Sequence, residues 1–288
     1  SAQVGKKVDV ESIEGYEARI FENKKFSRIL PYRFFTPENV DNNKKYPLVI
    51  FMHGAGKAQG TDNTSQLIHG SKVFVKPDIQ AKYPAFVIAP QCPRDVWWVN
   101  VKTPESMPPE IEAEVKKEKS KKVFRMKARE LMNDPDLYFP LDIQNITEPM
   151  QMVSDLIDEI IQKYPVDPDR VYITGGSMGG LGTWCLAYIN PKRPAAIAPF
   201  CSPSDPENAK MLNKIPIWIF HGDADDYFPV KASRDMKNAL EAAGNKDVKY
   251  TEVAGMPHGG LSPKAYMWDE NKDGEPDVVT WIFAQKRQ

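Results

Sequence analysis

Short, uninterrupted apolar segments recur along the chain and alternate with longer segments of mixed character. Strands that are covered by helices on both faces carry apolar side chains on both, so such segments predict buried strands of a parallel sheet. A pair of antiparallel strands is predicted before them, within residues 17–36. The predicted central strands are residues 48–52, 85–89, 171–174, 195–200, 215–220 and 248–253.

The segments between these strands have a helical pattern. From Val153 to Ile161, apolar residues recur at spacings of three and four, which predicts an amphipathic helix over residues 147–164. Alternating strands and helices indicate the α/β class, with a doubly wound, mostly parallel sheet, helices on both faces and a site at the carboxyl ends of the strands. Further helices are predicted at residues 178–189, 230–243 and 277–284.

One long segment does not fit this alternation. A chain of 288 residues can form one such domain, so residues 1–288 are predicted to be a single domain with an insertion at about residues 101–142. Lysine and glutamate dominate residues 111–131, and apolar positions are scattered. We expect a charged, amphipathic helix pair that covers the site as a lid and packs through a narrow apolar stripe. Its apolar residues are expected to be too few to form a core of their own. A mobile surface excursion is the alternative.

Composition excludes several classes of protein. The chain has 38 basic and 39 acidic residues and no basic stripe interleaved with aromatic residues, so no nucleic acid partner is expected. No apolar run approaches the roughly 20 residues that cross a bilayer. Three cysteines, Cys92, Cys185 and Cys201, give an odd number without metal-like spacing, so no disulfide framework is indicated. The chain starts at Ser1, which is expected of a processed secreted or periplasmic protein or of a trimmed chain.

A serine between glycines interrupts the strand-like segment that begins at Val171. Gly175, Gly176, Ser177, Met178 and Gly179 follow the apolar run directly, and a helical pattern begins after them. This arrangement is typical of a nucleophile elbow, in which a side chain at Gly175 or Gly179 would collide with neighbouring backbone. A simple glycine-rich turn or a phosphate-binding loop is the alternative.

Histidine and aspartate follow the serine in the order expected of a catalytic triad. Of the four histidines, His53 and His221 precede glycines at the ends of apolar runs and are expected to brace turns, and His69 is expected to be solvated. His258 lies on a small-residue loop after the last strand and is the predicted general base.

The acid of the triad is predicted in the loop after the strand at residues 215–220. Asp223, Asp225 and Asp226 compete for this role, and the spacing from His221 favours Asp225. The other two carboxylates would cap turns or be solvated. The order serine, aspartate, histidine is the order of the α/β-hydrolases.

These motifs resemble the α/β-hydrolase superfamily from about residue 16 to the end of the chain. The resemblance is to esterases related to dienelactone hydrolases, polyhydroxyalkanoate depolymerases and feruloyl or acetylxylan esterases, a group also labelled predicted peptidases. It implies the α/β-hydrolase fold and an oxyanion hole with one amide from Ala55, with Gly56 as the near alternative. The other amide is expected from Met178, the residue after the nucleophile. The segment at residues 101–142 departs from the family pattern.

Two further motifs leave alternatives open. Trp97 and Trp98 follow a predicted strand at the edge of the site, where they would either stack on a substrate or pack beneath a loop. Residues 269–274 resemble the first half of a calcium loop, but Thr280 stands where glutamate is required, so a solvated turn is preferred and no metal is assigned.

The sequence therefore predicts a serine carboxylic-ester hydrolase that works through an acyl-enzyme and needs no cofactor. Its substrate would be a small-molecule or carbohydrate ester, such as an acetyl or feruloyl ester. A serine peptidase of the same fold and a non-catalytic hydrolase-like binding protein are the alternatives. The motifs do not predict the acyl and alcohol specificity or the oligomeric state.

Overall fold

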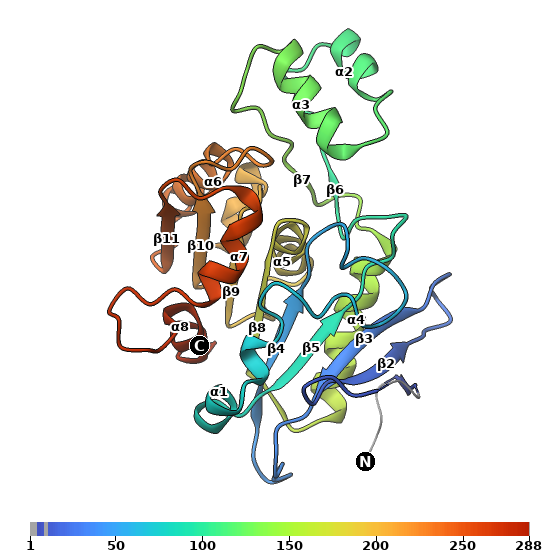
Figure 1. Cartoon of the computed structure of the whole chain (residues 1–288), viewed down its shortest axis with the longest axis vertical. Helices are drawn as coiled ribbons and strands as arrows, with labels where there is room; N and C mark the ends of the chain where they lie inside the picture. Colours follow the sequence, from blue (N-terminus) through green and yellow to red (C-terminus); the bar gives the residue numbers. More distant parts are fainter. Residues whose placement is uncertain (1–4, 9–10, 288) are drawn as a thin grey trace.

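A nine-stranded, mostly parallel sheet forms the centre of the computed structural model, which describes residues 5–8 and 11–287 (Figure 1). The strand order is β1-β2-β3-β5-β4-β8-β9-β10-β11, with antiparallel pairing from β1 to β5 and parallel pairing from there on. The strands are β1 (Lys6–Lys7), β2 (Glu17–Phe21), β3 (Leu30–Phe35), β4 (Tyr46–Met52), β5 (Phe86–Pro90), β8 (Val166–Gly176), β9 (Ala196–Phe200), β10 (Ile217–Gly222) and β11 (Val248–Val253).

Helices cover both faces of the sheet, because the strands carry apolar side chains on both. One buried cluster joins the sheet to α4 (Glu148–Lys163), α5 (Met178–Ile189) and α6 (Lys231–Ala242). A second cluster on the opposite face joins it to α1 (Pro77–Lys82), α7 (His258–Tyr266) and α8 (Asp277–Phe283). Short 3₁₀ helices, η1 (Val73–Val75) and η2 (Pro206–Leu212), complete these layers. The predicted α/β, doubly wound class is confirmed.

The strand order reverses direction between β4 and β8, which are neighbours in the sheet. Met52, the last residue of β4, is paired with Gly175 near the end of β8. In open α/β sheets, such a switch point at the carboxyl ends of the strands is where ligands bind. The loops that follow these two strands therefore lie side by side at the predicted site.

The insertion folds as a helix pair on a two-stranded stem (Figure 1). β6 (Asn100–Val101) pairs with β7 (Leu141–Asp142), and between them lie α2 (Pro109–Val115) and α3 (Lys121–Leu131). The expectation that it lacks a core of its own is wrong, because a small separate cluster is buried there. Its buried members are Met107, Val115, Ala128, Leu137 and Phe139.

The lid predicted for this segment stays a prediction, but the apolar residues of α3 do not all face the cleft. Val123, Met126 and Leu131 of this helix are exposed. Arginines, rather than apolar residues, contact the loop that carries the acid, as described below. No helix in the described ranges combines the length and the apolar character that crossing a membrane requires.

Candidate active site

Ser177 lies in a sharp turn between β8 and α5, with a φ angle of 59°. A non-glycine residue adopts this backbone region at a cost, which the surrounding packing must offset. A Cβ on Gly175 would lie 2.3 Å from the carbonyl oxygen of Met52, and a Cβ on Gly179 would lie 1.9 Å from the same atom. The two glycines therefore allow the close approach of β4 to the turn that exposes Ser177.

His258 connects the serine to a carboxylate. Its Nε2 lies 2.8 Å from Oγ of Ser177, and its Nδ1 lies 2.7 Å from Oδ2 of Asp225. The carboxylate can only accept, so Nδ1 carries a proton and Nε2 is free to accept the hydrogen of the serine hydroxyl. The expectation that His258 lies on a loop is wrong, since it is the first residue of α7.

Asp225 is fixed by four hydrogen-bond donors and its side chain has no exposed surface. The backbone amides of Tyr227 and Phe228 donate to Oδ1, each at 2.9 Å, and Nδ1 of His258 donates to Oδ2. Nε2 of His221 lies 3.2 Å from the same Oδ2. Burial alone would raise the pKa of Asp225, but the hydrogen bonds from His221 and His258 outweigh it and lower the pKa below its usual range.

The two competing carboxylates lie elsewhere. Asp223 is exposed and accepts a hydrogen bond from the amide of Gly255 at 2.6 Å. The side chain of Asp226 is 72% exposed and lies 3.8 Å from Nζ of Lys122. Neither is bonded to His258 within the described part of the chain, so Asp225 is the carboxylate that the fold brings to the imidazole.

His221 is buried beneath the loop that carries Asp225, called the acid loop below. It braces this loop, as its position before a glycine suggests. Its Nε2 also lies 2.8 Å from the carbonyl oxygen of Phe228, and its Nδ1 lies 2.6 Å from Oγ of Ser233. Because both groups near Nε2 are acceptors, this nitrogen carries the proton. His221 therefore ties the loop after Asp225 to α6.

The loop after β4 places Ala55 beside Ser177. Gly54, Ala55, Ser177 and His258 line a common cavity of about 130 Å³. The amide of Gly56 donates to Oε1 of Gln59 at 3.1 Å, so Ala55 is the better placed donor of the two alternatives. Met178 is the first residue of α5, a position whose amide has no carbonyl partner within the helix.

His53 braces this loop from below. Its Nδ1 donates to the carbonyl oxygen of Gly54 at 2.7 Å, and its Nε2 accepts from the amide of Cys92 at 2.9 Å. Burial lowers the pKa of His53 to about 4, so the ring is neutral at neutral pH. A neutral ring can accept one hydrogen bond and donate the other, as both neighbours require.

Acid is therefore expected to destabilise the protein through His53. Between about pH 6.5, the ordinary histidine pKa, and the folded pKa of about 4, the unfolded chain binds a proton that the folded chain does not. Stability consequently falls as pH falls through this window, by roughly 3 kcal/mol in all. Urea unfolding at pH 7 and pH 4 should show that His53→Gln removes this part of the pH dependence. Equal pH dependence in both proteins would contradict the assignment.

Trp97 and Trp98 have different environments. Trp98 is fully buried, and its Nε1 donates to the carbonyl oxygen of His53 at 3.2 Å. The prediction that it contacts substrate is therefore wrong, and its role is packing beneath the loop. Trp97 is partly exposed, and cations of α3 lie against its ring, with Nζ of Lys121 at 4.1 Å and Cζ of Arg125 at 4.9 Å.

Two arginines of the insertion hold the acid loop, a contact that the sequence reasoning missed. The guanidinium of Arg129 donates to the carbonyl oxygens of Asp226 and Tyr227, at 3.0 and 2.6 Å. Nη1 of Arg125 donates to the hydroxyl of Tyr227 at 3.3 Å. The ring of Tyr227 stacks on that of His258, with 5.0 Å between centroids. The spacing of four between the arginines, which puts both on one face of a helix, was the available signal.

A cavity of about 560 Å³ has none of the triad residues in its lining. It is lined by Trp218, Trp281 and the segment at residues 269–277, where a calcium loop was considered. Asp269 accepts hydrogen bonds from the amides of Asp273 and Gly274 within its own loop. Both carboxylate oxygens of Asp269 therefore accept hydrogen bonds from backbone amides of the turn that this segment forms.

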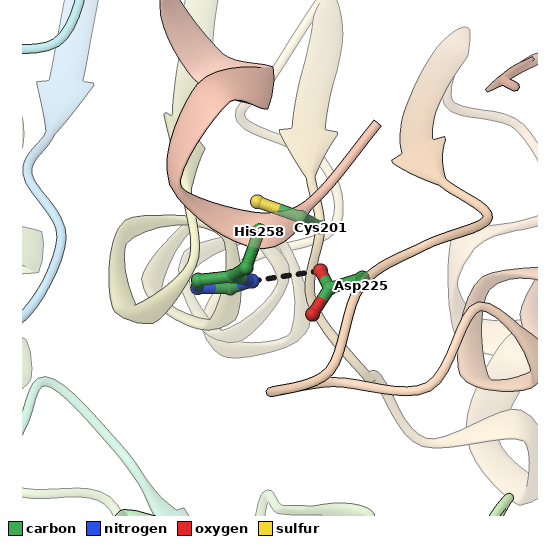
Figure 2. A group of neighbouring side chains, drawn as sticks. All are labelled: Cys201, Asp225 and His258. Atoms are coloured by element: carbon green, nitrogen blue, oxygen red, sulfur yellow. Dashed lines mark hydrogen bonds and ion pairs between the residues drawn. The ribbon is translucent and has the colours of Figure 1, made fainter. Parts of the chain in front are cut away.

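Cys201, Asp225 and His258 are the group of side chains in the described ranges whose spacing would suit a metal ion (Figure 2). Their ligand atoms lie within 4.8 Å of one another. However, burial raises the pKa of the Cys201 thiol to about 12, and Nδ1 of His258 already carries a proton donated to Asp225. Metal ligands must be deprotonated, so this group does not fit a metal.

Known proteins with similar sequences are esterases and related hydrolases. A family model described as phospholipase/carboxylesterase matches residues 135–264. The chain is 38% identical over 85 residues to the bifunctional acetylxylan esterase/xylanase XynS20E of Neocallimastix patriciarum, which is 30% of this chain and 12% of that protein. It is 26% identical over 176 residues to a candidate carboxymethylenebutenolidase of Methylorubrum extorquens, covering 51% of this chain and 60% of that protein.

Solved structures agree with these similarities. A thermostable esterase superimposes with a TM-score of 0.69 and 31% identity, covering 96% of this chain and 64% of the other. The chain therefore has the α/β-hydrolase fold. Its sequence and structure are similar to those of esterases of the dienelactone hydrolase and acetylxylan esterase type. The chain covers less than two thirds of the length of each of these three relatives.

Proposed function

We propose that the protein is a serine carboxylic-ester hydrolase. The observation that carries the proposal is the hydrogen-bonded series Ser177–His258–Asp225, with distances of 2.8 and 2.7 Å. The names of the relatives support the reaction class, and the order and geometry of the three residues support the mechanism.

In the proposed reaction, Nε2 of His258 accepts the proton of Ser177 as Oγ attacks the ester carbonyl. Asp225 holds Nδ1–H in place and stabilises the positive imidazolium that results. The amides of Ala55 and Met178 donate to the oxyanion, and each such donor lowers the barrier by about 3 to 4 kcal/mol. His258 then gives the proton to the leaving alcohol. In the second half of the reaction, His258 takes a proton from water as the water attacks the acyl-enzyme, and it gives this proton to Oγ of Ser177 as the acid leaves. The reaction needs no cofactor.

The cavity at Ser177 favours a small acyl group. Its volume of about 130 Å³ is small for a ligand pocket, which typically measures about 300 to 1,000 Å³. An acetyl group, with three heavy atoms, fits this volume, whereas a feruloyl group has several times as many atoms. We therefore propose short-chain esters, acetyl esters of carbohydrates among them, as the substrate class.

Comparison of acetyl, butyryl and feruloyl esters tests this proposal. We expect kcat/KM to be highest for the acetyl ester and lowest for the feruloyl ester, and peptide anilides to be cleaved far more slowly than any ester. The measurement is initial rates with a common chromogenic leaving group. Preferred cleavage of the peptide substrates would identify a peptidase of the same fold instead.

A further inference from the structure

Two cations of α3 lie beside the active site without an anionic partner. In the described part of the chain, no carboxylate forms an ion pair with Lys121 or Arg125. Arg125 is only 4% exposed, and its Nε has no hydrogen-bond partner. Its Nη1 reaches the carbonyl oxygen of Lys121, at 3.2 Å, and the hydroxyl of Tyr227. The rings of Trp97, Tyr227 and Phe228 lie against the guanidinium, with Cζ 4.9, 5.4 and 5.1 Å from their centres, but no anion in the described ranges neutralises its charge.

Other cations of the insertion do have partners. Lys116 pairs with Glu112, Lys117 pairs with Glu114, and Lys127 pairs with both Glu114 and Glu118. Glu118 lines the same cavity as Lys121 and Arg125, but its carboxylate pairs with Lys127. Desolvation, followed by repulsion from Arg125, lowers the pKa of Lys121 to about 8. A negative charge beside the ammonium group would favour its charged form and so oppose both effects.

The two cations line a cavity of about 350 Å³ between α3 and the loop that carries Trp97. The ring of Tyr227 contacts both Arg125, which lines this cavity, and His258 of the triad. Cζ of Arg125 lies 5.4 Å from the centre of the Tyr227 ring, which lies 5.0 Å from the centre of the His258 ring. The guanidinium is therefore within about 10 Å of the imidazole.

We propose that the substrate carries an anionic group, in the simplest case a carboxylate, that binds between Lys121 and Arg125 while its ester lies at Ser177. This specificity site rests on the proposed esterase function and narrows its substrates to acidic esters. The carboxylate lies on the alcohol part of the ester, because the cavity at Ser177 favours a small acyl group. A carboxylate on the acyl part is the alternative that the test distinguishes. A guanidinium and an ammonium suit a carboxylate, because hydrogen bonds between charged groups are short and strong.

Matched substrate pairs test the proposal and distinguish the two parts of the ester. For the acyl part, the pair is 4-nitrophenyl hydrogen adipate and the same ester with its carboxylate converted to an N-methyl amide. For the alcohol part, the pair is 3-(4-acetoxyphenyl)propanoate and its N-methyl amide. The readout is the ratio of kcat/KM for the acidic ester to that for the neutral ester. General losses of activity cancel in this ratio.

The wild-type ratio should exceed about tenfold in one of the two pairs, as expected of charge-assisted hydrogen bonds. Arg125→Gln should reduce this ratio by about tenfold. Lys121→Gln should reduce it by about threefold, and the fold should tolerate this change because Lys121 is exposed. Lys117→Gln is the matched control, because it removes the same charge from the same segment at a residue that does not line the cavity. It should leave the ratio unchanged.

A purely structural role for Arg125, such as holding Tyr227, would lower both rates equally and leave the ratio intact. Wild-type ratios near one in both pairs, or a ratio that neither Arg125→Gln nor Lys121→Gln alters, would overturn the anionic site. If the neutral esters were nevertheless hydrolysed in a manner that depends on Ser177, the proposed esterase function would stand. No hydrolysis of any of the four substrates would overturn both.

Discussion

Replacing Ser177 with alanine is expected to reduce ester turnover by on the order of a million-fold. Oγ of Ser177 is the atom that forms the bond to the acyl group in the proposed reaction, and no other hydroxyl is bonded to Nε2 of His258 in the described ranges. Alanine keeps the Cβ, so the strain at this positive φ is unchanged. Steady-state rates with an acetyl ester measure the effect.

The fold of the Ser177→Ala protein should be unaffected, which circular dichroism and the midpoint of thermal unfolding can check. Ser262, whose hydroxyl lines the same cavity, offers a matched control. Ser262→Ala should retain most of the activity. Turnover near the wild-type rate in the Ser177→Ala protein would contradict the serine mechanism.

Asp225→Asn is expected to reduce turnover by as much as ~10,000-fold, although it changes a single atom. The amides of Tyr227 and Phe228 hold one oxygen of the carboxylate, so the new NH₂ group would replace the oxygen that faces His258. Two donors cannot share a hydrogen bond, so the imidazole must move its proton from Nδ1 to Nε2. In that tautomer, Nε2 cannot accept the proton of Ser177.

Asp226→Asn is the control for this change, because Asp226 lies on the same loop and its side chain is 72% exposed. Its kcat/KM should remain within a few-fold of wild type. If Asp226→Asn were instead the more damaging substitution, Asp226 would have to take the role of the acid. Both proteins can be compared in one assay of initial rates against substrate concentration.

The sheet and the three central residues follow from local signals. The apolar runs predict β4, β5, β9, β10 and the second half of β8, because a strand covered on both faces has no polar positions to interrupt it. The edge strand β11 is mostly half-exposed and contains polar residues, so this reason does not apply to it. The glycines around Ser177 predict the turn because only residues without a Cβ allow the approach of Met52. Choosing Asp225 over its neighbours needed only the spacing from His221, since the loop after β10 is short.

Features that depend on distant contacts could not be predicted in this way. Trp98 and Trp97 are adjacent in sequence, but only Trp98 points towards His53 and is buried. Helix α7 begins at His258 without a capping side chain, because the residue before it is Pro257. The sequence therefore has no capping signal for this helix start. The small core of the insertion combines residues such as Met107 and Phe139, which are separated by the whole helix pair. No local pattern links such positions.

Labelling with a fluorophosphonate, followed by mass spectrometry of the digested protein, tests the central claim most directly. This reagent reacts with a serine whose proton a neighbouring base can remove, and it requires no knowledge of the substrate. We expect one adduct, on Ser177, that is lost in the Ser177→Ala protein and forms much more slowly in the Asp225→Asn protein. An unlabelled wild-type protein, or an adduct on another residue such as Ser202 or Ser262, would contradict it.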